Sequence, residues 1–429
     1  MTRILIRVLV ALLPLTVLFG TYAAVGPLTS FRAVVAVLAV VALAKGTSWP
    51  RQWPLIIVGA AWVVVGVVSG LVVSWTPAWG DLANLVVGLV LVWALSRVRS
   101  DDTLGDLTVG WEVAILISLP IAVWEHRTTR HLPQFIDGLW RGRPLVYPLP
   151  GTFFPNPNYY ALFLVLGLGL IVWHAMVTGG WQRWCHVVMA LASVYLLWLT
   201  GSKLCLMGAL LMAIGAALTW KYGRMAVGVV AVVVAVLALG PGRARLLSAC
   251  NDVVAVVMHH ANLGSHSWPV RLSLLGFGLH IIGTHPLLGV GPGGFAHLAR
   301  HPGVYSLHHK TNPHNGLIHV ACDYGVVVAA VLVVAWVWGI VRGFQRCAHH
   351  PGHTRQIARL YIAMMFAVPA LMMANSVFVG PNVVALWMAV LVLLDTMVGP
   401  QENVKPKRPM TVADRATNRV VGGGDDRLG

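Results

Sequence analysis

The stretch YYALFLVLGLGLIVWHAMV, residues 159–177, contains no Asp, Glu, Lys or Arg. A helix that crosses the hydrocarbon core of a membrane needs about 20 mostly apolar residues, because lipid offers the backbone no other hydrogen-bond partner. Similar stretches recur along the chain, and 58% of its 429 residues are apolar while only 10% are charged. This composition excludes a water-soluble domain and predicts an all-α, polytopic membrane protein.

The apolar stretches predict about 12 transmembrane helices. The expected spans are 4–24, 31–44, 55–74, 82–97, 107–124, 159–177, 183–199, 203–220, 224–240, 315–341, 357–376 and 380–398. They divide the chain into helices in 1–124, a loop in 125–158, helices in 159–240, a large loop in 241–313, helices in 314–399 and a disordered tail in 400–429.

Basic residues in short loops indicate the orientation, because Lys and Arg are retained on the cytoplasmic side. Those that fall on one side of the predicted spans are Arg3, Arg7, Lys45, Arg51, Arg97, Arg99, Arg183, Lys221, Arg224, Arg342, Arg346, Arg355, Lys405, Lys407 and Arg408. We therefore expect both termini in the cytoplasm and the two long loops outside it. The net charge of +16 lies between spans, so we expect a bilayer and no nucleic acid as partner.

The five cysteines, Cys185, Cys205, Cys250, Cys322 and Cys347, lack the paired spacing of a disulfide framework or a zinc site. We expect free thiols. Four histidines, His301, His308, His309 and His314, lie close in sequence, but no acid or cysteine completes an orderly ligand set. We therefore expect no metal and no cofactor. The alternative is a metal site, and loss of activity in the presence of a chelator would favour it.

Residues 271–325 carry the most informative pattern in the chain. The run WPVRLSLLGFGLHIIGTHP at 268–286 places apolar residues on one side at helical spacing, with Arg271 and His280 away from that side or at its edge. This pattern predicts an amphipathic helix at the membrane interface. The turn HPLLGVGPGGF at 285–295 follows, and its glycines permit tight backbone geometry or close approach to a ligand.

The run KTNPHNGL at 310–317 predicts a helix start, with Asn312 as the cap and Pro313 in the first turn. His314 then lies at a helix N-terminus, where the helix dipole favours a neutral imidazole and attracts anions. Such a histidine is suited to act as a base. The alternative is that His314 and Asn315 only satisfy polar groups at a buried helix start.

Two further elements precede this region. In LTGSKL at 199–204, Ser202 can cap a helix whose first turn contains Lys203, a position where a cation is favoured only by a nearby anion. In GTFFPNPNYYALF at 151–163, Asn156, Asn158 and Tyr159 can reach the same surface. The alternative for Lys203 is a lysine that extends to the membrane interface, and the same alternative applies to Arg271. The alternative for residues 151–163 is an ordinary turn at the start of a helix.

Taken together, these motifs resemble those of the O-antigen ligase and polymerase family of bacterial envelope proteins. The resemblance rests on Ser202 and Lys203 at the start of a span, Arg271 before an amphipathic helix, HPLLGVGPGGF at 285–295 and HNGLIHVACDYG at 314–325. It covers roughly residues 151–335. In one respect the chain departs from the family, which usually has arginine where this chain has Lys203, so a bidentate phosphate contact is replaced by a point charge.

The resemblance implies a GT-C-like fold in the bacterial inner membrane and a metal-independent, inverting glycosyl transfer from undecaprenyl diphosphate at the periplasmic face. Arg271 and Lys203 are then expected to bind the diphosphate, and His314 to activate the acceptor hydroxyl. The further candidates for substrate binding are Asn315, Asn158, Arg141, Arg143 and Lys310. Guanidinium groups beside a membrane are well matched to phosphate.

The family includes several activities that the residues alone do not separate. We expect an O-antigen ligase whose acceptor is lipid A core, with an O-antigen polymerase as the first alternative and a protein O-oligosaccharyltransferase as the second. A transporter of lipid-linked glycan is the alternative outside this class. Transporters usually place ionisable groups near the middle of the bilayer, whereas here the predicted spans are almost free of charge.

Overall fold

The computed structural model describes residues 2–26, 28–45, 53–133, 139–140, 143–144, 148–220, 222–225, 227–228, 267–303, 305, 307, 310–374 and 382–398. Within these ranges most residues are helical. Two small antiparallel hairpins pair β1 (Ala24–Val25) with β2 (Leu28–Thr29), and β3 (Leu139–Trp140) with β4 (Arg143–Pro144). The expected all-α architecture is confirmed.

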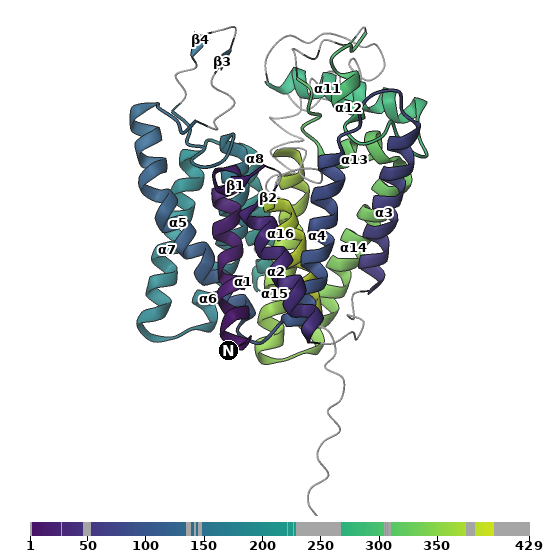
Figure 1. Cartoon of the computed structure of the whole chain (residues 1–429). Coiled ribbons are helices and arrows are strands. Elements are labelled where there is room, and N and C mark those ends of the chain that lie inside the picture. Colours follow the sequence, from purple (N-terminus) through teal and green to yellow (C-terminus); the bar gives the residue numbers. More distant parts are fainter. Residues whose placement is uncertain are drawn as a thin grey trace, which may run out of the picture.

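Long helices form a bundle, shown in Figure 1. Those of the first half are α1 (Thr2–Phe19), α2 (Ser30–Ala44), α3 (Trp53–Val72), α4 (Trp79–Val98), α5 (Thr103–Thr128), α6 (Pro157–Val177), α7 (Gly180–Leu199) and α8 (Lys203–Leu218). Those of the last part are α14 (Val326–His349), α15 (Gly352–Ala374) and α16 (Asn382–Val398). A short 3₁₀ helix, η1 (Gly20–Ala23), follows α1.

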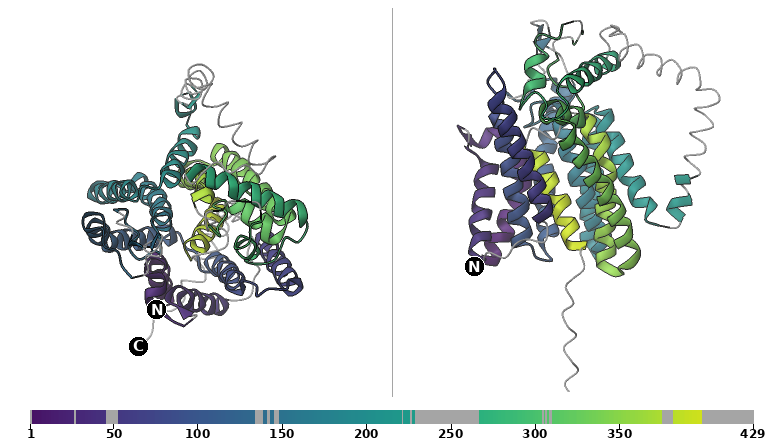
Figure 2. Two further views of the ribbon diagram at one scale, coloured as in Figure 1. Left: turned by 90° about the horizontal axis from the view of Figure 1, so that it is seen from above. Right: turned by 90° about the vertical axis from the view of Figure 1, so that its right-hand side faces the viewer.

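Helices joined by short connections run in opposite directions, so the connections lie alternately at the two ends of the bundle. The upper end, as drawn in Figure 1, carries both hairpins and the helices α11 (Ser267–Thr284), α12 (Gly294–Leu298) and α13 (Gly316–Tyr324). Figure 2 shows that α11 lies across this end rather than along the bundle. The lower end carries the start of α1 and the short connections that follow α4, α6 and α14.

Among the described residues, α1, α3, α4, α5, α6, α14 and α15 have the length and apolar character needed to cross a membrane. Helices α2, α8 and α16 are apolar but shorter. The chain is a multi-pass membrane protein, as its composition predicts. Apart from α14, these helices begin and end within a few residues of the expected spans, because an apolar run can satisfy its backbone hydrogen bonds in lipid only as a helix.

One expected span differs from the structure. The stretch 315–341 was predicted as one continuous helix, but α13 ends at Tyr324 and α14 begins at Val326. Gly325 separates them with a φ of +88°, and a Cβ atom there would collide with the backbone of Leu287. The predicted span 224–240 from residue 229 onward, the loop 241–266 and the tail 400–429 lie outside the described residues.

Helices α6 and α15 form the centre of the bundle. Most of their residues are buried, because α6 and the part of α15 after Arg359 consist almost entirely of apolar residues. Helix α8 packs closely on α15 through glycines: a Cβ at Gly208 would lie 2.7 Å from Leu371, and one at Gly215 would lie 2.9 Å from Phe366. Small residues allow helix backbones to approach in this way inside a membrane.

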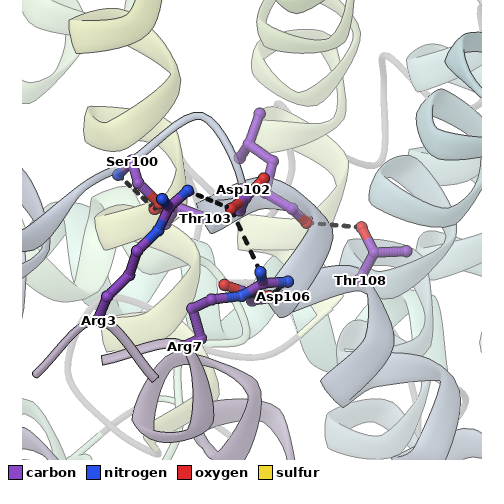
Figure 3. Close-up of polar contacts among 8 residues, drawn as sticks. Arg3, Arg7, Ser100, Asp102, Thr103, Asp106 and Thr108 are labelled. Carbon is purple, nitrogen blue, oxygen red and sulfur yellow. Dashed lines mark hydrogen bonds and ion pairs between the residues drawn. The ribbon is translucent and has the colours of Figure 1, made fainter. Parts of the chain in front are cut away.

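Ion pairs join helices at the lower end. Arg3 binds Asp102 at 3.1 Å, and Arg7 contacts Asp102 at 3.4 Å and Asp106 at 3.0 Å, which connects α1 to the start of α5 (Figure 3). On the other side of the bundle, Arg346 of α14 binds Asp395 of α16 at 3.1 Å. These basic residues therefore have a structural role in the described part of the chain.

Candidate active site

Helix α11 buries one side, but its apolar and polar residues are not separated into two faces as the sequence predicts, because Leu279 is exposed and Ser273 is buried. Its residues Leu274 and Ile281 are buried, Gly278 lies against Ile318 and Cys322 of α13, and His280 is exposed. The Cys322 thiol also donates to the Gly278 carbonyl, at 3.4 Å between the two heavy atoms. These contacts hold α11 against α13 and set the position of Arg271, which is half-buried in the first half of α11.

His314 lies immediately before α13, in a tight turn. The Asn312 side chain accepts a hydrogen bond from the His314 backbone N–H at 2.8 Å, and His314 has a left-handed φ of +49°. The cap of α13 is Asn315, whose side chain accepts from the N–H groups of Leu317 and Ile318 at 3.1 Å each. The predicted cap at Asn312 is therefore wrong by three residues.

A left-handed backbone is uncommon for a residue other than glycine and costs conformational energy. The surrounding structure maintains it here, because Asn312 binds the backbone on one side of the imidazole and Asn315 begins the helix on the other. His314 thus lies on a short turn that Asn312 and Asn315 stabilise from either side. A histidine whose backbone is fixed in this way is suited to a functional site, where side chains must be held in one geometry.

The His314 imidazole is neutral over the whole physiological pH range. Burial, followed by the charges of Arg271 and Lys310, lowers its pKa to about 4, and a backbone hydrogen bond at Ala374 opposes this shift. Its Nδ1 atom is buried and has no hydrogen-bond partner among the described residues. A neutral imidazole was expected, and burial together with the charges of Arg271 and Lys310 favours it.

Arg271 and His314 meet at the upper end of α15. The Arg271 guanidinium donates to the Met373 carbonyl at 3.1 Å, and His314 bonds to the backbone of the next residue, Ala374. Burial lowers the pKa of Arg271, although the group stays charged because its ordinary pKa is so high. The last turn of α15 is thus the element that sequence reasoning missed, because no charge or motif marks it.

Lys203 begins α8 at the same level of the bundle. Gly215 of α8 packs beside Phe366, and Gly208 packs beside Leu371, so the two helices are antiparallel and the start of α8 lies level with the end of α15. Lys203 is exposed. Ser202 occupies the N-cap position of α8 as expected, but its side chain forms no cap bond.

Asn158 lies close to the first turn of α8, because its backbone carbonyl accepts a hydrogen bond from the Cys205 thiol at 3.8 Å. Asn156 instead caps α6, with its side chain accepting from the Tyr159 N–H at 3.1 Å. The turn before α6 is held by Glu125, a buried carboxylate that accepts from the Thr152 N–H at 2.7 Å. The Asn156 side chain therefore has a structural role, whereas the contact of Asn158 uses only its backbone.

The glycine-rich turn 285–295 packs on the junction of α13 and α14. Val290 N–H donates to the Cys322 carbonyl at 2.8 Å, and the buried Asp323 carboxylate accepts from the N–H groups of Gly293 and Phe295 at 2.8 and 2.9 Å. His319 lies 3.2 Å from the same carboxylate. The glycines of this turn therefore allow it to approach the chain's own backbone at the junction of α13 and α14.

The remaining candidates are distributed as follows. Lys310 is exposed and close enough to His314 to affect its charge. Arg143 begins β4 at the upper end, and Arg141 lies outside the described residues, as do His308 and His309. Within the described ranges no three His, Cys, Asp or Glu residues are arranged to hold a metal ion. Arg271, His314 and Lys310 are thus the candidates that the structure brings together, with Lys203 level with them.

A comparison with known protein families matches the part of the chain that contains these candidates. Residues 187–333 match the sequence model of the O-antigen ligase family (Wzy_C), and this segment includes Lys203, Arg271, Lys310 and His314. The chain is also 24% identical over 311 residues to the teichuronic acid biosynthesis protein TuaE of Bacillus subtilis (strain 168). That alignment covers 67% of this chain and spans 60% of the relative's length. The resemblance expected from the motifs is confirmed.

Proposed function

We propose that this member of the O-antigen ligase and polymerase family transfers a glycan from a polyprenyl diphosphate donor to a sugar hydroxyl, at the upper end of the bundle. In this proposal the upper end is periplasmic, the membrane is the bacterial inner membrane, and the acceptor is lipid A core. Arg271 and Lys203 bind the diphosphate and His314 acts on the acceptor.

The observation that carries the proposal is the arrangement at the end of α15. Arg271 and His314 bond to consecutive residues there, Met373 and Ala374, and Lys203 starts the neighbouring helix at the same level. None of these cations forms an ion pair with an acidic residue in the described structure. Fixed cations without carboxylate partners are suited to an anionic ligand, and diphosphate is the anion of the donor class.

The proposed reaction forms one bond and breaks another at the anomeric carbon of the donor sugar. The acceptor oxygen attacks this carbon, its proton passes to His314, and the bond from the carbon to the phosphate oxygen breaks with inversion. Polyprenyl diphosphate leaves with the bonding electron pair, and the cations stabilise its developing negative charge. General-base assistance of this kind contributes ~10²–10⁴-fold in rate.

Donor binding adjusts the basicity of His314. A pKa of about 4 makes the ring a weak base in the absence of donor. Arg271 and Lys310 cause part of this depression, so a diphosphate that neutralises them raises the pKa of His314 toward its ordinary value. The base therefore becomes effective when the donor is in place.

Polymerisation is the second candidate activity. The similarity to a protein named for teichuronic acid biosynthesis favours it, because that name refers to building a cell-surface polymer. In a polymerase the acceptor is the terminal sugar of another lipid-linked glycan. The cations and His314 serve both reactions in the same way, so the acceptor is what separates them.

A complementation experiment tests the proposal and separates the two activities. The chain is expressed in a bacterial strain that lacks its O-antigen ligase, and lipopolysaccharide is analysed by gel electrophoresis. O-antigen attached to lipid A core supports the ligase. Glycan that lengthens only on polyprenyl diphosphate identifies a polymerase, and no change in any lipid-linked glycan, with the protein present in the membrane, refutes the transferase.

A further inference from the structure

A second feature of the bundle lies away from the candidate active site. A cavity of about 840 Å³ opens between α6, α7, α8 and α15, along their lower halves. Its wall is mostly apolar and includes Leu168, Val172, Val194, Met212 and Ala363. We call it the lower cavity. The proposed transfer reaction does not use the lower cavity, because that reaction is placed at the opposite end of these helices.

The lower cavity opens sideways, through the outer surface of the bundle. Five of its lining residues are large and exposed: Val172 by 41%, Met176 by 44%, Leu191 by 64%, Val194 by 46% and Trp220 by 48%. In a membrane protein such an apolar lateral opening faces hydrocarbon rather than water. Acyl chains are therefore the groups that fit its walls.

The lower rim of the cavity carries two arginines, Arg183 and Arg359. The Arg359 guanidinium lies over the Trp220 ring, 5.1 Å from its centroid, and its polar contact in the described structure is a long one, 3.4 Å to the Gln356 side chain. Its Nε atom is buried and has no partner there. Arg183 donates to the Thr178 carbonyl at 3.2 Å.

These two arginines differ from four other arginines at the lower end. Arg3, Arg7, Arg342 and Arg346 each form an ion pair with an aspartate, whereas Arg183 and Arg359 form none among the described residues. The cavity lining also contains no acidic residue. Its rim therefore attracts a phosphate group and provides no partner for the ammonium of a zwitterionic headgroup.

We propose that the lower cavity binds an anionic phospholipid, with its acyl chains against the apolar wall and its phosphate on Arg359 and Arg183. The lipid completes the hydrogen bonding of Arg359 and fills the space between α7 and α8. Basic pockets between transmembrane helices bind anionic headgroups by the same chemistry. The site is separate from the donor site, so it does not depend on the proposed transferase activity.

Native mass spectrometry of the full chain in detergent tests this proposal. Phosphatidylglycerol is titrated against phosphatidylcholine with the same acyl chains. The wild type is expected to bind phosphatidylglycerol more tightly, and Arg359→Gln is expected to weaken that binding by about tenfold. The control is Arg355→Gln, one turn earlier on α15 and outside the cavity lining, which is expected to leave binding unchanged.

A second variant tests the cavity rather than the charge. Ala213 is a small, exposed residue of the lining, so Ala213→Trp fills the space and is expected to reduce phosphatidylglycerol binding as well. Leu210→Trp adds the same group at an exposed α8 position outside the lining. The proposal stands only if Arg359→Gln and Ala213→Trp both reduce binding and both controls do not. Any other pattern, including equal binding of the two lipids, overturns it.

Discussion

Two groups of basic residues, one at each end of the bundle, form different kinds of contact. At the lower end, Arg3 and Arg7 pair with Asp102 and Asp106 (Figure 3), and Arg342 and Arg346 pair with Asp395. At the upper end, Arg271 donates to a backbone carbonyl, and neither it nor Lys203 or Lys310 pairs with an acid in the described structure.

Two acids of the upper end, Glu125 and Asp323, bind the backbone instead. Glu125 holds the backbone of Gly151 and Thr152, and Asp323 holds the glycine-rich turn and lies beside His319. The difference teaches which charges stabilise the fold and which remain available for a ligand. Paired arginines connect helices, whereas cations left without a carboxylate beside a neutral histidine indicate a site for an anionic substrate.

The largest expected effect is on the rate of glycan transfer. His314→Ala removes the proposed base, so we expect transfer to fall ~10²–10⁴-fold. The measurement is transfer by membranes that contain equal amounts of folded protein. His280→Ala is the matched control, because His280 is also at the upper end but is exposed on α11. Near-normal transfer by His314→Ala would remove this residue from the mechanism.

The next effect concerns stability at the lower end. The side chains of Arg346 and Asp395 are only 9% and 8% exposed, and Arg346→Gln leaves Arg342, at 3.3 Å, as the cation that still pairs with this buried carboxylate. We expect a loss of about 1.5–3 kcal/mol in the free energy of unfolding, as for the loss of a hydrogen bond to a charged group, with transfer per folded molecule unchanged. The double variant Arg346→Gln/Asp395→Asn, in which both charges are removed, is expected to recover part of this loss. If the single variant retains wild-type stability, the structural role of this pair is wrong.

Arg271→Gln tests the upper end in two ways. We expect the donor Kd to rise about 10–100-fold, because a partly buried cation that binds diphosphate is lost. The variant also removes one cause of the low pKa of His314, so that pKa rises. Histidine is active as a base only when neutral, so the acid limb of the pH–rate profile moves to higher pH.

The control for this prediction is Arg300→Gln, an exposed arginine of the same end. In the wild type, free of donor, the imidazole is neutral above about pH 5 and is protonated only as the pH falls through about 4. An NMR titration of His314 in both proteins measures this directly. An unchanged titration together with an unchanged donor Kd would separate Arg271 from the site.

The smallest expected effect is at Lys203. Lys203→Ala is expected to weaken donor binding several-fold, since an exposed point charge contributes less than a partly buried guanidinium. Lys203→Arg is expected to be tolerated, because the charge is retained and the family usually has arginine at this position. Isothermal titration with a soluble polyprenyl diphosphate analogue provides the comparison, and equal affinities in all three proteins would exclude Lys203.

Local pattern predicted the helices well and their ends less well. The apolar runs located α1 to α8 and α14 to α16, but the break at Gly325 was missed because the residues on both sides of it are apolar. The cap of α13 was placed at Asn312 instead of Asn315 because both asparagines suit a cap. Which of them begins the helix depends on the left-handed turn at His314.

The sequence by itself determined that this chain crosses a membrane as helices, because lipid cannot bond the backbone and the apolar runs are long enough. It also determined which cations and which histidine are candidates for chemistry. Only the tertiary structure decided that Arg271 and His314 meet at Met373 and Ala374, far from both of them along the chain. That meeting results from the packing of α11 on α13 and from the contact of Arg271 with the end of α15, which depend on shape and close contact between distant segments rather than on any local pattern.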